Sequence, residues 1–214
     1  MTVAERRKGP DTRERLMDAA EAAILEKGFA ATSIDELIAE VGITKSGFFY
    51  HFPDKGELAK ALLQRYLDRE EALFDDLFAR ARELDDDPLH AFLIGLKLFA
   101  EMMTDLPEGH PGCLVASYCY QENLFNRDVR DLNREGVLRW RRRFGGYLEE
   151  IAARYPPRVD IRLDELADMF SAIADGGIIL SKVVQDRQVL PQQFLLYRSF
   201  VRCVFLGTGD PATA

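Results

Sequence analysis

Four consecutive residues in the first quarter of the chain combine small, polar and cationic groups: Thr44, Lys45, Ser46 and Gly47. Hydroxyl and ammonium groups can donate hydrogen bonds to the base edges of DNA, and a glycine lets the backbone approach them closely. Three further donors follow in the sequence, Tyr50, His51 and Lys55, and these side chains suit phosphate oxygens. The types and order of these residues therefore indicate a surface that contacts DNA.

Two short helices joined by a sharp turn are predicted to position these groups. The first begins in the capping sequence Thr32-Ser-Ile-Asp35 and stops at Gly42. Thr44 can cap the second, which must end before Pro53 because the residue preceding a proline avoids the α region. The pattern predicts a helix-turn-helix, whose second helix can enter a major groove. An ordinary corner between two helices is the structural alternative.

The rest of the chain has apolar residues at helical spacing and no strand-like alternation of apolar and polar residues. This pattern predicts an all-α fold of about nine helices. Capping residues, glycines and prolines set the expected boundaries of the other helices. These helices are expected over residues 11–27, 54–84, 88–104, from 113, 128–154, 163–186 and 191–206. Phe48 and Phe52 are expected to hold the short second helix of the motif against its neighbours.

The composition limits the possible function classes. A chain of 214 residues with 47% hydrophobic content can bury a core, and no apolar run reaches the length of a membrane span. The first residues lack the apolar region of a secretory signal, so we expect a cytoplasmic protein. The net charge of −8 means that any contact with DNA must be local. One basic cluster near the N-terminus could make such a local contact or could be a solvated tail. It consists of Arg6, Arg7, Lys8, Arg13 and Arg15.

The sequence gives no sign of a metal, a cofactor or an enzymatic centre. The three cysteines have no CxxC spacing, and the chain contains no GxGxxG, Walker loop, HExxH or GxSxG motif. An all-α enzyme is therefore a remote alternative. Cys113 stands where a helix is expected to begin, and a helix N-terminus favours a thiolate, so a redox or electrophile sensor is a second alternative. A buried, unreactive cysteine is the simpler interpretation.

Residues 28–62, GFAATSIDELIAEVGITKSGFFYHFPDKGELAKAL, resemble the TetR family of transcriptional repressors. The resemblance implies a three-helix DNA-binding domain, a connecting fourth helix, and a C-terminal helical domain that forms a homodimer and binds a small-molecule inducer. On this basis we expect a DNA-binding domain at 1–55, a ligand-binding and dimerisation domain at 56–207, and a disordered tail at 208–214.

The resemblance also implies roles for individual residues at double-stranded operator DNA. Contacts to bases or to the groove fall on Thr44, Lys45, Ser46 and Gly47. Contacts to phosphates fall on Thr32, Ser33, Tyr50, His51 and Lys55. Phe49 stands where the family usually has tyrosine. Because it lacks the hydroxyl, we expect it to contact only a sugar or a thymine methyl group.

The C-terminal part contains many apolar and aromatic residues and a few polar ones, the combination that lines ligand pockets. Plain core packing is the alternative for any one of these aromatic residues. The candidates are Phe92, Phe99, Met103, Cys113, Ser117, Tyr118, Gln121, Trp140, Phe144 and Phe170. The last two helices carry more apolar surface than one partner helix covers, and small residues such as Gly176 and Gly177 would let a second copy approach closely.

Overall fold

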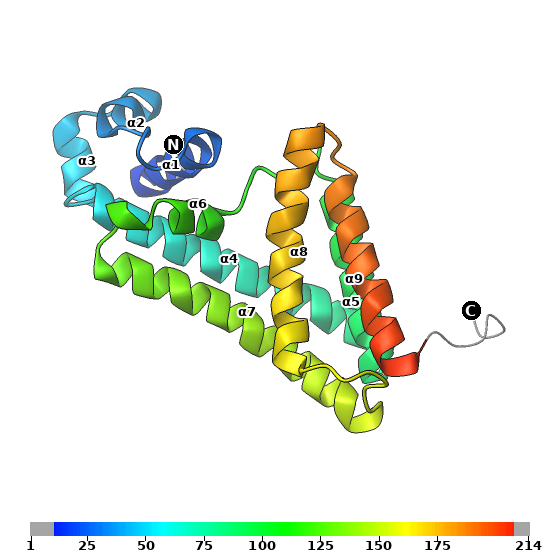
Figure 1. The fold of residues 1–214 in the computed structure, drawn as a ribbon. Helices are drawn as coiled ribbons and strands as arrows, with labels where there is room; N and C mark the ends of the chain where they lie inside the picture. Colours follow the sequence, from blue (N-terminus) through cyan, green and yellow to red (C-terminus); the bar gives the residue numbers. More distant parts are fainter. Residues whose placement is uncertain (1–10, 208–214) are drawn as a thin grey trace, which may run out of the picture. The chain divides into compact units, whose positions relative to one another are not determined.

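The structure is a computed structural model that describes residues 11–207, and within this range all of its regular secondary structure is helical (Figure 1). The helices confirm the predicted all-α class and most of the predicted boundaries. They are α1 (Thr12–Lys27), α2 (Ile34–Val41), α3 (Lys45–His51), α4 (Lys55–Leu84), α5 (Pro88–Thr104), α6 (Leu114–Tyr120), the 3-10 helix η1 (Glu122–Leu124), α7 (Arg127–Arg154), α8 (Leu163–Val184) and α9 (Val189–Leu206). The predicted tail at 208–214 and the basic residues Arg6, Arg7 and Lys8 lie outside the described range.

The chain forms two compact units that do not simply follow chain order. Of the described residues, the first unit comprises 11–66 together with Leu114–Asn133, and the second comprises Leu67–Cys113 together with 134–207. The sequence predicts one boundary between residues 55 and 56. In the structure, each compact unit instead combines two segments that are separated along the chain. Helices α4 and α7 each contribute residues to both units.

Capping residues explain where the first helices begin and end. Asp11 caps α1, and Gly28 ends it with a φ of 86° that favours glycine. Ser33, rather than the predicted Thr32, caps α2, because its hydroxyl accepts a hydrogen bond from the Glu36 amide at 3.1 Å. Phe48 and Phe52 are both buried, as predicted for the residues that anchor α3. The core of this unit also includes Leu16, Met17, Ala20, Ile24, Leu37, Val41, Leu58 and Leu62.

The second unit is built around aromatic side chains. Helix α9 packs beside both α5 and α8 (Figure 1). The rings of Phe144 and Phe170 stack with centroids 3.9 Å apart, and the buried Tyr197 hydroxyl donates to the Leu166 carbonyl at 2.9 Å. The burial of this apolar and aromatic surface is the main contribution to the stability of the unit. Of the helices in the described range, none has the length and apolar character needed to cross a membrane.

Candidate nucleic-acid interface

The link between α2 and α3 is a sharp turn made possible by Gly42. This residue has a φ of 72° and a ψ of 41°, the left-handed region that favours glycine. Its amide donates to the Ile38 carbonyl at 3.0 Å, and the next amide, that of Ile43, donates to the same oxygen at 3.0 Å. These bonds end α2 and turn the chain directly into α3. The pair is therefore a helix-turn-helix, as the sequence predicts.

Thr44 fixes the first turn of α3. Its hydroxyl accepts from the Gly47 amide at 3.2 Å and lies 2.9 Å from the Ser46 hydroxyl. Lys45 is exposed, and its ammonium lies 3.5 Å from the Asp35 carboxylate. Thr44 is thus committed to capping the helix, while the Lys45 and Ser46 side chains stay accessible to a ligand.

The outer side of α3 carries exposed aromatic side chains. Phe49 is 44% exposed and Tyr50 is 85% exposed, although both follow directly after the buried Phe48. The imidazole of His51 lies edge-on to the Tyr50 ring with centroids 5.1 Å apart. Neighbouring exposed aromatic residues beside a cation mark a surface that is suited to binding. The structure therefore brings Lys45, Phe49 and Tyr50 to the surface of one short helix.

Gly47 has no packing reason to be glycine. A Cβ atom added there would lie 3.5 Å from the Thr44 hydroxyl oxygen and 3.6 Å from the Ile43 Cβ, which are ordinary contacts. Glycine inside a helix is less stable than alanine by about 0.5–1 kcal/mol. A residue that costs stability without relieving a steric clash fits a place where another molecule comes close to the backbone.

Two of the residues expected at phosphates have structural contacts of their own. Thr32 is only 1% exposed, and its hydroxyl donates to the Gly28 carbonyl at 3.0 Å, so the structure does not present it to DNA. The Lys55 ammonium donates to the Phe29 carbonyl and lies 4.0 Å from the centroid of the Phe29 ring. Burial lowers the pKa of Lys55. Lys55 therefore holds the α1–α2 turn, and Ser33 is the exposed residue at the start of α2.

The candidate ligand-pocket residues separate into two groups. Ser117, Tyr118 and Gln121 belong to the first unit, not to the ligand-binding part in which they were expected. The buried Tyr118 hydroxyl donates to the Ala59 carbonyl at 3.0 Å, and the Gln121 side-chain oxygen accepts from the Ala30 amide at 2.9 Å. Gln121 thus holds the α1–α2 turn, whereas the Tyr118 bond joins α6 to α4. Sequence spacing could not have found these contacts, because they join residues far apart in the chain.

The other candidates lie together in the core of the second unit. Phe92, Phe99, Met103, Phe144 and Phe170 belong to one buried cluster, and Trp140 and Cys113 pack against it. Phe74, which the pocket prediction did not include, is central to the same cluster. Its ring lies 5.3 Å from Phe99, 5.2 Å from Trp140 and 5.4 Å from Phe144, measured between centroids. We name these residues, with Phe74, the aromatic cluster.

The fold and this surface define a helix-turn-helix DNA-binding protein. Residues 16–62 match the bacterial regulatory proteins of the tetR family. Transcriptional regulator AcuR of Cereibacter sphaeroides is 27% identical over 75% of this chain and 71% of its own length. HTH-type transcriptional repressor DhaR of a Mycobacterium species is 22% identical over 84% of this chain and 87% of its own. Residues 16–62 thus have the sequence of a tetR-family regulatory protein, and these relatives, which match most of the chain, are transcriptional regulators.

Solved structures support the same fold over nearly the whole chain. A TetR-family regulator from Agrobacterium tumefaciens has a TM-score of 0.75 at 18% identity, over 91% of this chain and 97% of that one. At this identity the likeness concerns the fold alone. Across residues 11–207, no group of three or more His, Cys, Asp or Glu side chains is arranged to hold a metal ion.

Proposed function

We propose that the protein is a ligand-responsive repressor: a homodimer that occupies operator DNA and is released by a small hydrophobic inducer. The observation that supports this most directly is the exposed first turn of α3, where Lys45, Ser46 and Gly47 are accessible on a helix anchored by the buried Phe48. The relative DhaR is named as a repressor. Action on DNA would place the protein in the cytoplasm.

In this proposal, the side chains of Lys45 and Ser46 and the backbone at Gly47 contact base edges. Ser33, Tyr50, His51 and Lys55 contact phosphates, which position the helix without specifying sequence. Phe49 contacts a sugar or a thymine methyl group. Since the chain has a net charge of −8, binding must depend on this small surface. Sequencing the genomic fragments that the purified protein retains would test the proposal, and an absence of enriched sites would contradict it.

Helices α8 and α9 carry the surface that we propose for dimerisation. Both helices expose large apolar side chains, which is unusual outside an interface. These side chains are Ile179, Leu180, Val183, Val184, Leu195, Leu196 and Phe200. Gly176 has open space around its Cβ position, whereas a Cβ at Gly177 would lie 2.7 Å from the Leu190 Cδ1 within the same chain. Gly176, not Gly177, therefore belongs to the proposed interface.

The proposed inducer site is the aromatic cluster of the second unit. Its side chains are packed against one another, so an inducer would have to displace part of this packing. A ligand shifts an equilibrium only by its difference in affinity for two states. We therefore propose that the inducer favours an opened cluster, and that in the dimer this state separates the two α3 helices by a spacing that no longer fits the operator.

Replacing Gly47 by alanine should have opposite effects on stability and on binding. We expect the free energy of unfolding to rise by about 0.5–1 kcal/mol, since the new methyl group makes only ordinary contacts. Operator affinity should fall by about tenfold or more, equivalent to about 1.4 kcal/mol. Denaturant unfolding and operator titration measure the two effects. Gly145→Ala is the matched control, because a Cβ atom at this α7 glycine would likewise meet no clash. Equal operator affinities for Gly47→Ala and Gly145→Ala would contradict the proposed groove contact.

The covalent alternative is tested at Cys113, the residue that precedes the seven-residue helix α6. Burial raises the pKa of Asp175, and a hydrogen bond with Cys113 opposes this rise. A carboxylate beside the thiol disfavours a second negative charge, so we expect non-covalent induction. Peroxide and a mild electrophile should leave the wild type and Cys113→Ser equally bound to operator, as followed by fluorescence anisotropy. Release of the wild type alone, reversed by a thiol reductant, would establish covalent sensing instead.

A further inference from the structure

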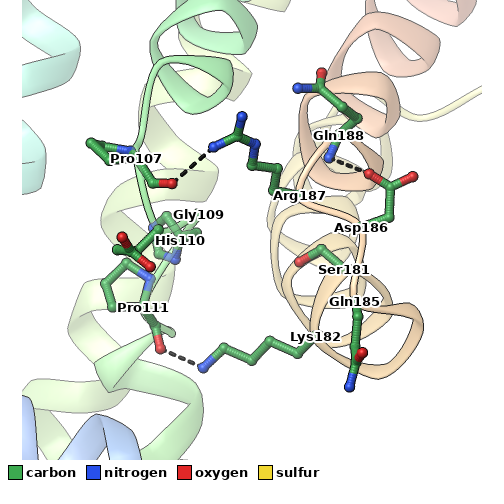
Figure 2. A pocket seen from close by; sticks show the side chains of 11 residues that line it. Pro107, Gly109, His110, Pro111, Ser181, Lys182, Gln185, Asp186, Arg187 and Gln188 are labelled. Carbon is green, nitrogen blue, oxygen red and sulfur yellow. Dashed lines mark hydrogen bonds between the residues drawn. The ribbon is translucent and has the colours of Figure 1, made fainter.

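A polar cleft of about 830 Å³ lies within the second unit, apart from the aromatic cluster (Figure 2). One wall is the loop between α5 and α6, at residues 107–111. The other is the corner that joins α8 to α9, with Ser181, Lys182 and residues 185–188. This volume falls within the range of small-molecule sites, about 300–1,000 Å³. None of the lining residues belongs to the buried cluster proposed for the inducer.

Two cations reach across this cleft to the opposite wall (Figure 2). The Arg187 guanidinium donates to the Pro107 carbonyl at 2.8 Å, and the Lys182 ammonium donates to the Pro111 carbonyl. Among the ion pairs of the described chain, neither cation has a carboxylate partner, whereas Arg141 binds both oxygens of Asp168. Each cation uses one donor here, although arginine has five N–H groups and lysine three. Most of their hydrogen-bonding capacity is therefore open to a ligand.

His110 adds a neutral donor to the same cleft. Its Nδ1 atom accepts a hydrogen bond from the Gly112 amide at 3.2 Å, so in the neutral ring the proton is on Nε2. Burial, aided by the charge of Lys182, lowers the pKa of His110 to about 4. The two carboxylates of the cleft do not neutralise the cations directly. Asp186 accepts from the Gln188 amide at 2.9 Å, and Glu108 is exposed.

We propose that this cleft binds a small carboxylate anion through Lys182 and Arg187. A guanidinium presents its N–H groups in a fork that matches a carboxylate, and such charge-assisted bonds are about twice as strong as neutral ones. The anion competes with the carbonyls of Pro107 and Pro111 for these cations. The loop that they hold runs on along the chain to Cys113 and α6. The anion therefore acts on residues 107–111, none of which belongs to the aromatic cluster.

The test measures binding directly, without DNA, so its outcome is independent of the proposed repressor function. Wild-type protein is titrated calorimetrically with succinate, with its neutral analogue succinamide and with inorganic phosphate, all at one ionic strength and pH 7. We expect saturable succinate binding that is at least about tenfold tighter than binding of either other compound. No saturable succinate binding, equal binding of succinamide, or tighter binding of phosphate would each overturn the proposal.

Variants then locate the site. Lys182→Gln and Arg187→Gln should each weaken succinate binding by about tenfold or more, and the double variant should abolish it. Lys182→Arg keeps the charge and should retain binding. Lys97→Gln, on α5 and ion-paired with Glu101, removes one exposed charge elsewhere and should leave binding unchanged. Equal loss in Lys97→Gln, or intact binding in the double variant, would rule out this cleft. Thermal melting checks that each variant is folded.

Discussion

Replacing Val183 by arginine is expected to convert the dimer to a monomer and to lower operator affinity by about 10²–10⁴-fold, the gain that linked binding sites provide. Val183 is 75% exposed on α8, beside the exposed Ile179 and Leu180. At a twofold interface the substituted residue occurs twice, on self-complementary surfaces. Two arginine side chains would then be buried without a partner, which costs several kcal/mol or more. Sedimentation velocity and operator titration measure the two losses.

The matched control for this variant is Val159→Arg. Val159 is also exposed, at 50%, but it lies between α7 and α8, outside the proposed interface. This variant should remain dimeric and bind the operator as the wild type does. Bound half-sites should be inverted repeats with centres about 34–36 Å apart. A stable wild-type monomer on a single half-site, or a Val183→Arg variant that is still dimeric, would refute the proposed interface.

The two glycines of α8, Gly176 and Gly177, show why the sequence alone does not identify which residues lie at the interface. Both were expected at the interface, because a small residue in an apolar helix permits close approach of a neighbour. Which neighbour approaches depends on how the helix is rotated about its axis. Gly177 is buried against Leu190 of α9, so Gly177→Arg would disrupt packing inside one chain. Loss of dimer in that variant would then follow from misfolding.

Most local signals are predicted correctly from the sequence, although Ser33 and not Thr32 caps α2. Thr44 as a cap, Gly42 as a turn and the end of α3 before Pro53 each depend on neighbours within a few residues, and the structure has all three. The same reasoning located the exposed turn of α3, since its polar residues Lys45 and Ser46 stand just before the anchor residue Phe48. Properties encoded by adjacent residues can be predicted without knowing the packing.

Contacts between segments that are far apart in the chain could not be predicted from neighbouring residues. Gln121 bonds the Ala30 amide, and Lys55 bonds the Phe29 carbonyl, yet no spacing rule links these pairs. Gln121 is predicted to line a ligand pocket because it is a polar residue among the apolar helices of the C-terminal part. Packing instead places it with the DNA-binding helices. The aromatic cluster was only partly identified for the same reason, because Phe74 joins it from α4.

Lys45→Ala is expected to reduce binding to operator more than binding to a scrambled duplex. Lys45 is exposed at the first position of α3, where a lysine can donate to a base edge, and a good specific contact is worth about 1–3 kcal/mol. The variant should therefore lose about 5–150-fold in operator affinity. Its exposed pairing with Asp35 contributes little to folding, so stability should hardly change. Titrations on both duplexes at several salt concentrations give the specific and nonspecific terms.

Two further variants separate base reading from simple loss of charge. Asp35→Asn combined with Lys45→Ala removes the carboxylate that Lys45→Ala leaves without its cation, and the specific loss should persist in this double variant. Tyr50→Phe removes a donor proposed for phosphate, so it should weaken both duplexes alike. Lys55→Ala is a poorer phosphate probe, because it also removes the bond that holds the Phe29 carbonyl. If Lys45→Ala weakens both duplexes equally, its ammonium contacts only the backbone of DNA, and sequence reading must come from Ser46, Phe49 and the backbone at Gly47.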